Sequence, residues 1–279
     1  VDTEKRNPHD FAVWIKAPEN HLMKWDSPWG PSYPGWHIEC SVMSQKYLGE
    51  VFDIHTGGID LIPTHHENEI AQSKGMCGKI PANYWMHGEF LLINGGKMSK
   101  SLGNVYLLQD IVDRGYDPLV YKLFCYSIQY RKKLNFTWEG MDSAKIALDR
   151  LREAYQKHLT GTEDVAEELI SKYEKDFNEA INDDLNMPVA MSVVWEVAKR
   201  TEKSKKVAEL LKKFDRVLGI KIDEHKEEEI PDDIKELLTK RVEARKNKDW
   251  AESDKIRDII KEKGYIVKDS KEGQTVEKC

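Results

Sequence analysis

The sequence contains no apolar run long enough to cross a membrane and no strong excess of one charge. Its 279 residues are 40% hydrophobic and 33% charged, and the formal net charge is −6. A membrane-spanning helix needs about 20 consecutive apolar residues, so we expect no membrane partner. The chain also lacks the overall basic charge typical of nucleic-acid binding, so any such contact must come from a local patch.

Cysteine is scarce. The four cysteines, Cys40, Cys77, Cys125 and Cys279, are widely and irregularly spaced. This spacing argues against a disulfide framework and favours a reducing compartment. The polar start, VDTEKRNPHDF, does not resemble a secretory signal, so we predict a cytoplasmic protein. Because the chain enters directly on a pattern typical of the middle of a domain, we also expect that an N-terminal part is missing.

The first part of the chain, residues 1–105, alternates predicted helices and strands with turns rich in glycine and proline. The pattern predicts a helix over 37–49 ending at Gly49, a buried strand over 51–58, a helix over 64–75 and a strand over 89–94. Thr64 and Glu67 have the spacing of a capping box. Such alternation favours an α/β layer.

The pattern becomes helical after residue 106. We predict a connecting fold over 106–141, a helical bundle over 142–222 and a small module over 223–279. The bundle's first helix is expected to begin at Asp142 and to bury one side, formed by Leu148, Leu151, Tyr155 and Leu159. Pro188 marks another helix start. An acidic connector, 220–231, precedes the module.

The small module has a local basic excess. It is predicted to contain two helices, a stop at Gly264 and a short strand over 265–267. Within 234–268 there are eleven Lys and Arg against seven Asp and Glu, which gives 11 − 7 = +4. A salt-bridged helical hairpin is the alternative interpretation.

The stretch GGKMSKSLGN, residues 95–104, places two lysines and two serines on a loop flanked by glycines. We call it the lysine loop. Glycine permits positive φ and close approach of a ligand, and an ammonium on a flexible stem is a strong partner for phosphate. Taken alone, the loop leaves a solvated basic turn open as the alternative.

Cys40, His65 and Glu69 form a second candidate group, the donor trio. His65 and Glu69 are four residues apart and share one helix face, whereas His66 is expected to point elsewhere. A thiol, an imidazole and a carboxylate suit a zinc site that keeps an open position. The alternative is that Cys40 is a small buried hydrophobic residue and HHENE a polar helix face.

Several segments, in this order and spacing, resemble the cysteinyl-tRNA synthetases, which are class I aminoacyl-tRNA synthetases. They are GWHIEC, DIHTGGIDLIPTHHENEIAQS, YWMHGEF, KMSKSLGN, YRKKLNFTWEGM (130–141), AINDDLNMP (180–188) and RVEARKNKDWAESDKIRDIIKEKG. The resemblance implies an α/β fold, the second half of a Rossmann-type catalytic domain, followed by an α-helical bundle and a small α+β anticodon-binding module. It also implies ATP-dependent activation of cysteine to cysteinyl-adenylate and transfer of the cysteinyl group to tRNA(Cys).

The resemblance further implies roles for individual residues. Lys97 and Lys100 would be catalytic, with Lys100 contacting ATP and stabilising charge on the pentacovalent phosphate. The other implied contacts are Gly57, Gly58, Asp60, Ser99 and Ser101 for ATP and Mg²⁺, Trp36 for the amino-acid pocket, and Cys40, His65 and Glu69 for Zn²⁺. In the basic module the candidate tRNA contacts are Lys240, Arg241, Arg245, Lys246 and Lys248 for phosphate and Trp250 for base stacking.

Two features of the family are absent from the sequence. The H-I-G-H signature that holds the ATP phosphates does not occur, and neither does a fourth zinc-ligating cysteine upstream. We therefore expect the chain to have little ligase activity by itself. We also expect a monomer. Two alternatives stay open, a cysteine ligase that acts on an amino-sugar and a non-catalytic tRNA-binding fragment. The basic module argues against the first.

Overall fold

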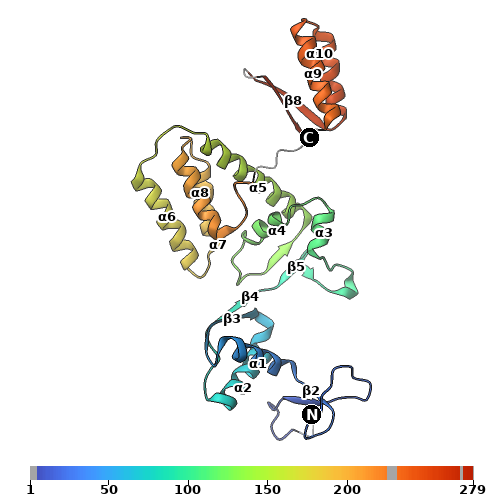
Figure 1. The fold of residues 1–279 in the computed structure, drawn as a ribbon, viewed down its shortest axis with the longest axis vertical. Coiled ribbons are helices and arrows are strands. Elements are labelled where there is room, and N and C mark those ends of the chain that lie inside the picture. Colours follow the sequence, from blue (N-terminus) through green and yellow to red (C-terminus); the bar gives the residue numbers. More distant parts are fainter. Residues whose placement is uncertain (1–4, 225–230, 271–272, 279) are drawn as a thin grey trace. The chain divides into compact units, whose positions relative to one another are not determined.

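The computed structural model describes residues 5–224, 231–270 and 273–278. The chain divides into two compact units, Val1–Glu224 and His225–Cys279. Figure 1 shows the chain coloured along its sequence. Part of the predicted acidic connector, 225–230, and Cys279 lie outside the described residues. No helix within the described ranges has the length and apolarity that a bilayer crossing requires.

The first unit begins with a small hairpin that leads into a helix. Strands β1 (Trp14–Lys16) and β2 (Ser32–Pro34) pair antiparallel, and α1 (Trp36–Leu48) follows. Gly49 ends α1 at φ +95°, a conformation that residues with a Cβ rarely adopt. The helix predicted over 37–49 is therefore confirmed.

A β-α-β unit follows α1. It contains β3 (Phe52–Gly58), α2 (Glu67–Cys77) and β4 (Ala82–Gly88), and the two strands pair in parallel. The predicted alternation is confirmed, but the predicted burial of the first strand is wrong, because the side chain of Ile54 is 54% exposed. Among the described residues β3 pairs with β4 alone, so much of its surface stays open to solvent.

The predicted capping box at the start of α2 is also wrong. Thr64 lies inside a π-helical turn, Ile62–His66, which runs directly into α2 at Glu67. No side chain caps the helix, and His66, the residue before it, already has helical angles. Because the preceding turn continues the helical backbone, Thr64 is not at a helix end that needs a cap.

A three-stranded sheet carries the lysine loop. Its order is β6 (Gly96–Lys97), β5 (Leu91–Ile93) and β7 (Leu134–Phe136), with β5 antiparallel to β6 and parallel to β7. The helices α3 (Leu108–Asp113) and α4 (Pro118–Cys125) lie between β6 and β7 in the chain. The strand predicted over 89–94 is confirmed as the first arm of the β5–β6 hairpin.

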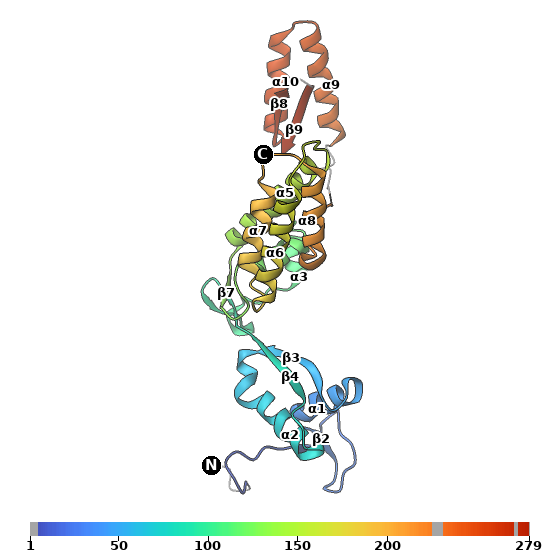
Figure 2. The same ribbon diagram turned by 90° about the vertical axis from the view of Figure 1, so that its left-hand side faces the viewer.

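Four helices form the bundle that Figure 2 shows from the side. They are α5 (Trp138–Leu159), α6 (Glu167–Asn182), α7 (Met187–Ala198) and α8 (Lys205–Leu218). Leu148 and Leu151 are fully buried as predicted, but Leu159 is 42% exposed. The predicted cap at Asp142 is wrong: α5 begins earlier, where the Thr137 side chain accepts from the Gly140 amide.

The second unit packs two helices against a hairpin. It contains α9 (Asp232–Lys246), α10 (Trp250–Glu262), β8 (Tyr265–Ser270) and β9 (Gly273–Lys278), with the strands antiparallel. The two helices and the first strand are confirmed, and β9 was not predicted. The predicted order of an α/β part, a helical bundle and a small α+β module is thus confirmed, while the boundaries drawn inside the first unit stay a prediction.

Candidate metal centre and lysine loop

The structure brings the donor trio together. Cys40 comes from α1, His65 from the π-helical turn and Glu69 from α2, and their ligand atoms all lie within 4.8 Å of one another. His65 and Glu69 are buried, and Cys40 is partly buried. The trio is therefore a real cluster in three dimensions, with donors of the three kinds that zinc accepts.

One carboxylate oxygen of Glu69 is buried in this cluster without a hydrogen-bond partner. Its Oε2 accepts a hydrogen bond from Nε2 of His55 at 2.9 Å. Its Oε1 lies 2.9 Å from Nε2 of His65, but this pair lacks hydrogen-bond geometry and Oε1 is buried without a hydrogen-bond partner. A buried carboxylate oxygen without a donor is unfavourable. A cation shared by the trio would satisfy this oxygen, so the residues fit a metal ion.

Burial sets the protonation of the other two donors. It raises the pKa of the Cys40 thiol, and the negative charges of Glu69 and Glu39 raise it further. Burial lowers the pKa of His65, against the opposing effect of Glu69. Without a cation the thiol is therefore neutral and the imidazole uncharged, whereas a bound cation favours the thiolate.

A group of histidines that the sequence analysis did not predict surrounds the trio. Nδ1 of His37 is 2.7 Å from Nδ1 of His65, and Nδ1 of His66 is 2.8 Å from Nε2 of His87. Contrary to the expectation that His66 points away, His55, His66 and Glu69 form a second set of close ligand atoms. Burial and the neighbouring histidines lower the pKa of His66 to about 4.

Strand pairing, rather than the sequence pattern, relates two of these histidines to each other. His55 pairs with Trp85, and Gly57 pairs with His87, in the parallel register of β3 and β4. Alternate residues of a strand share one face, so His55 and His87 lie on the same side of the sheet as Gly57. The pairing of β3 with β4 was needed to see this, and the sequence pattern does not supply it.

Trp36 lies beside the trio. Its ring centroid is 3.9 Å from that of His65, and the indole is 54% exposed. It thus offers an open aromatic surface next to the donor trio, where the amino-acid pocket was predicted. Its contact with a substrate stays a prediction.

The glycines at the end of β3 have a packing role that is visible in the structure. A Cβ on Gly57 would lie 2.7 Å from Cε1 of His66, and one on Gly58 would clash with the Asp60 carboxylate. Asp60 itself is exposed in a 3-10 turn, Ile59–Leu61. These residues therefore leave room for His66 and present a carboxylate to solvent. Their contact with ATP stays a prediction.

The lysine loop is held in a defined conformation. Asn104 accepts from the Ser99 amide at 2.8 Å and donates from Nδ2 to the Lys97 carbonyl at 2.9 Å. Met98 packs against the core, while Lys97 and Lys100 are exposed. The two ammonium groups thus stand on an ordered turn rather than on a loose one.

The serines of the lysine loop also act within it. Ser99 caps the short 3-10 turn Lys100–Leu102 by accepting from the Leu102 amide, and the hydroxyls of Ser99 and Ser101 are 3.1 Å apart. The two hydroxyls therefore lie within hydrogen-bond distance of each other. The structure therefore brings together the residues predicted for this loop. The two hydrogen bonds of the Asn104 side chain, to the Ser99 amide and the Lys97 carbonyl, were not predicted, and we call them the Asn104 clasp.

The predicted tRNA contacts of the second unit divide into three kinds. Lys246, Lys248 and Trp250 are exposed, and Lys240 and Arg245 are paired with Glu236 and Asp269. Arg241 differs from all of these. It is 2% exposed, and its guanidinium donates to Asp269 at 2.8 Å and to Gln274 at 2.6 Å. This burial argues against Arg241 as a phosphate contact and assigns it to the packing of α9 against the hairpin.

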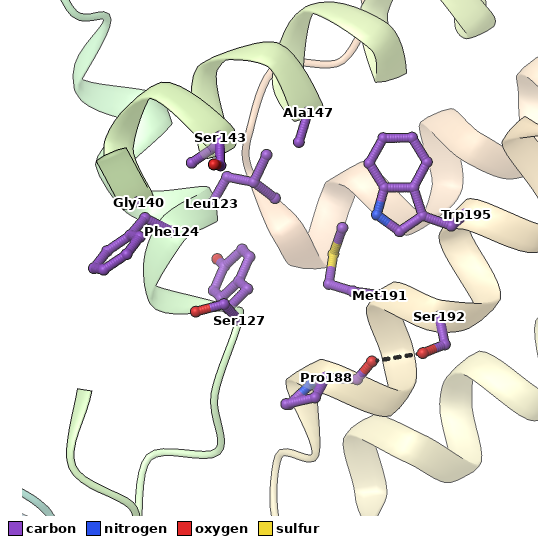
Figure 3. A pocket seen from close by; sticks show the side chains of 12 residues that line it. Leu123, Phe124, Ser127, Gly140, Ser143, Ala147, Pro188, Met191, Ser192 and Trp195 are labelled. Atoms are coloured by element: carbon purple, nitrogen blue, oxygen red, sulfur yellow. Dashed lines mark hydrogen bonds between the residues drawn. The ribbon is translucent and has the colours of Figure 1, made fainter. Parts of the chain in front are cut away.

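A pocket of about 470 Å³ lies elsewhere in the first unit, between α4, α5 and α7 (Figure 3). Phe124, Met191 and Trp195 contribute apolar walls. The Ser192 hydroxyl at its edge is already bonded to the Pro188 carbonyl. None of the residues predicted for cysteine, ATP, zinc or tRNA lines this pocket, so it is separate from the candidate site.

Three family models match the chain. They are "tRNA synthetases class I (C) catalytic domain" over residues 1–146, "DALR domain" over 176–223 and "Cysteinyl-tRNA ligase anticodon binding domain" over 227–276. The first covers more than half of the 279 residues. The third disfavours the amino-sugar ligase that the sequence left open.

Curated relatives agree. The chain is 44% identical over 275 residues to Cysteine--tRNA ligase 1 of Burkholderia lata, 43% identical over 294 residues to the Cysteine--tRNA ligase of Bacillus cereus strain B4264, and 41% identical over 302 residues to that of Treponema denticola. These matches take in 97%, 98% and 96% of this chain but only 57%, 62% and 61% of the relatives. The chain thus spans about three fifths of their length.

A solved structure supports the fold. A LeuRS of Agrobacterium radiobacter K84, in a ternary complex with tRNA and LeuAMS, matches with a TM-score of 0.53 at 15% identity. The match covers 71% of this chain and 32% of that one. At this identity the likeness concerns the fold alone.

Proposed function

Because the chain belongs to the cysteinyl-tRNA synthetases of class I, we propose that it serves the ligation of cysteine to tRNA(Cys). ATP would activate cysteine to cysteinyl-adenylate, and the cysteinyl group would then pass to the 3′ end of the tRNA. The observation that carries this proposal is the buried donor trio with its unpaired Glu69 oxygen. The free thiols of Cys40, Cys77 and Cys125 support the further inference that the protein acts in the reducing cytoplasm, and we propose that it acts there as a monomer.

The donor trio would hold zinc, with an open position for the substrate. Bound zinc would supply a Lewis acid that binds the substrate's sulfur as a thiolate. A soft thiolate ligand is one that serine cannot offer, and a site built around a specific polar bond rejects the analogue that lacks it. In this chain Nε2 of His55 donates a hydrogen bond to Oε2 of Glu69, and the Trp36 ring lies against the His65 ring at the edge of the cluster, tilted by 31°.

The lysine loop would serve the ATP step. Lys97 and Lys100 place two mobile positive charges on an ordered turn, where they can stabilise the negative charge that develops on a transferring phosphate. Ser99 and Ser101 present a pair of hydroxyls beside Lys100. At the end of β3, Gly57, Gly58 and Asp60 would border the adenosine, with Asp60 close to the ribose and Mg²⁺ accompanying the phosphates.

The second unit would meet the anticodon. Lys240, Arg245, Lys246 and Lys248 supply positive charge on and just after α9, and phosphate contacts of this kind give affinity that falls with salt. Trp250 is 58% exposed and can stack on an unpaired base. Arg241 is not part of this set because its guanidinium is already bonded inside the unit.

The decisive experiment measures binding of this chain to transcribed tRNA(Cys) and to the same tRNA with its GCA anticodon altered. The proposal predicts tighter binding to the GCA tRNA, with the difference lost when residues 225–279 are exchanged for an unrelated sequence. Equal affinity for both tRNAs would contradict anticodon recognition by this unit. No binding of either tRNA would contradict the proposal that the chain serves tRNA charging.

A further inference from the structure

Two sequence motifs without a role in the proposed site meet in the first unit. They are YRKKLNFTWEGM (130–141) and AINDDLNMP (180–188). The second forms the corner between α6 and α7. Its residues Asp184 and Leu185 both have positive φ, at +52° and +53°. This conformation is uncommon for residues other than glycine and is unfavourable for leucine, so the surrounding contacts must hold the corner in place.

Asp184 makes those contacts with the turn that precedes β7, residues 129–131, which we call the support turn. Its carboxylate accepts from the Tyr130 hydroxyl at 2.6 Å and from Nε and Nη2 of Arg131 at 2.5 and 3.1 Å. Nε2 of Gln129 donates to both the carboxylate, at 3.2 Å, and the carbonyl, at 3.1 Å. One residue thus bonds three consecutive side chains that lie more than 50 positions away in sequence.

The support turn also holds the link between the two halves of the candidate site. The Glu89 amide donates to the Tyr130 carbonyl at 2.9 Å, and the Leu134 amide donates to the Phe90 carbonyl at 3.2 Å. Glu89 and Phe90 connect β4, which carries His87, to β5, which begins the lysine-loop hairpin. The chain from the metal centre to the lysine loop therefore runs along a turn that Asp184 fixes.

From this arrangement we propose that Asp184 is a positioning residue, which couples the α6–α7 corner of the bundle to the lysine loop through the support turn. The physical route is continuous, from the corner to Tyr130 and Arg131, then to Glu89 and along β5. A contact that only closed the corner would need no partners outside it. The corner also has its own backbone bonds, from Leu185 to Ile181 and from Asn186 to Ala180, so the side-chain bonds of Asp184 hold the support turn as well as the corner.

The proposal makes a specific prediction for backbone exchange in the full chain without any ligand. Asp184→Asn removes the charge that pairs with Arg131, and the Glu89 amide should then exchange about tenfold faster, since its acceptor is no longer held. Tyr130→Phe removes a single hydrogen bond and should give a smaller change in the same direction. The matched control is Asp176→Asn, because Asp176 is an aspartate on α6 whose carboxylate pairs with Lys172 on the same helix.

Hydrogen exchange measured by NMR or mass spectrometry decides the outcome. Faster exchange at Glu89 and across the lysine loop in Asp184→Asn, but not in Asp176→Asn, supports the proposal. Faster exchange confined to residues 180–187 overturns it, because the contact would then serve the corner alone. If Asp184→Asn fails to fold, the Tyr130→Phe result decides in the same way.

A second measurement connects the coupling to the proposed function, on which this last step rests. Affinity for Mg·ATP should fall several-fold in Asp184→Asn and stay unchanged in Asp176→Asn, because the lysine loop is displaced without losing a residue. Unchanged affinity together with faster exchange in the loop would overturn the functional part of the coupling. If the unsubstituted chain binds no Mg·ATP, that result contradicts the proposed ATP site, and the exchange data still decide the inference.

Discussion

Oε1 of Glu69 and Nε2 of His65 lie 2.9 Å apart, one helical turn from each other, in a geometry that makes no hydrogen bond. Two buried groups at this distance would normally share a proton along a straight line. Here both atoms face the same space, in which the Cys40 thiol is the third donor. The arrangement suits groups that ligate one ion better than groups that pair with each other.

The first prediction concerns this ion. Glu69→Gln removes a charged ligand and should weaken zinc binding by about 100-fold or more, since even residues outside the ligand shell change affinity by about 10- to 100-fold. Competition with a chromophoric chelator measures the affinity. Glu67→Gln, an exposed substitution in the same helix turn, should leave it unchanged. Equal affinities for the two variants would remove Glu69 from the site.

A pair of glycine substitutions tests the packing around the metal centre. Gly57→Ala places a Cβ 2.7 Å from Cε1 of His66 and should destabilise the first unit by about 1–3 kcal/mol, as overpacking does. Gly75→Ala has nothing within 4 Å of the added carbon and should stabilise α2 by about 0.5–1 kcal/mol, because alanine is the better helix former. Urea unfolding gives both values. Unchanged stability of Gly57→Ala would contradict the close approach of His66 to β3, and a loss of stability in Gly75→Ala would contradict the open space at that position.

The clasp of the lysine loop gives the third prediction. Asn104→Asp keeps an acceptor for the Ser99 amide and loses the donor to the Lys97 carbonyl, whereas Asn104→Ala loses both bonds. The Ser99 amide should therefore stay protected from exchange in the aspartate variant and lose protection in the alanine variant. Exchange measured at that amide distinguishes them. Protection in both variants would mean that Met98 alone orders the loop.

Arg241 provides a fourth test, which separates a structural arginine from a tRNA contact. Arg241→Ala breaks a buried charged network and should destabilise the second unit by about 2 kcal/mol or more. Lys246→Ala, an exposed change on the same helix, should keep the stability of the unit and weaken tRNA binding. The slope of the logarithm of the binding constant against the logarithm of the salt concentration should fall by about one. Amide exchange in β8 and titration with tRNA at two salt concentrations measure the two effects. Weaker tRNA binding by Arg241→Ala at unchanged stability would show that Arg241 contacts tRNA phosphate.

Local chemistry explains which parts of the fold could be predicted from the sequence. Gly49 and Pro188 act through their own backbone, one at a helix end and one at a helix start, so the boundaries beside them were predicted well. The lysine loop and the His65–Glu69 pair were found for the same reason, because their members are close in sequence. Cys40 was grouped with that pair because of its donor chemistry, and the resemblance to the synthetases gave the same three residues.

Features that depend on distant partners were missed. Thr64 has the right spacing for a capping box, yet the π-helical turn before α2 leaves nothing to cap. The histidines around Glu69 come from α1, β3, the turn before α2 and β4. The parallel pairing of β3 with β4 places His55 and His87 on one side of the sheet, and the packing of α1 and the turn against that side adds the others. Arg241 looked like its exposed neighbours in sequence, and its burial depends on β8 and β9, of which the second was not predicted. The misses at the histidines and at Arg241 concern packing between elements, whereas β9 and the π-helical turn are elements that the sequence pattern did not predict.

The last prediction follows from the acidity of Asp184. Hydrogen bonds from Arg131 and Tyr130 lower its pKa from the ordinary value of 3.8 to about 2. A carboxyl group whose pKa is depressed in the folded state stabilises that state above the unfolded pKa, and loses this contribution as the pH falls through the folded pKa. The difference in urea midpoint between the unsubstituted chain and Asp184→Asn should therefore be constant above about pH 5 and shrink as the pH falls from about 4 toward 2. Unfolding curves collected across this range check it, with Asp176→Asn as the control for losing a charge from α6. A difference that persists undiminished down to pH 2 would mean that Asp184 acts through the shape of the corner and not through its charge.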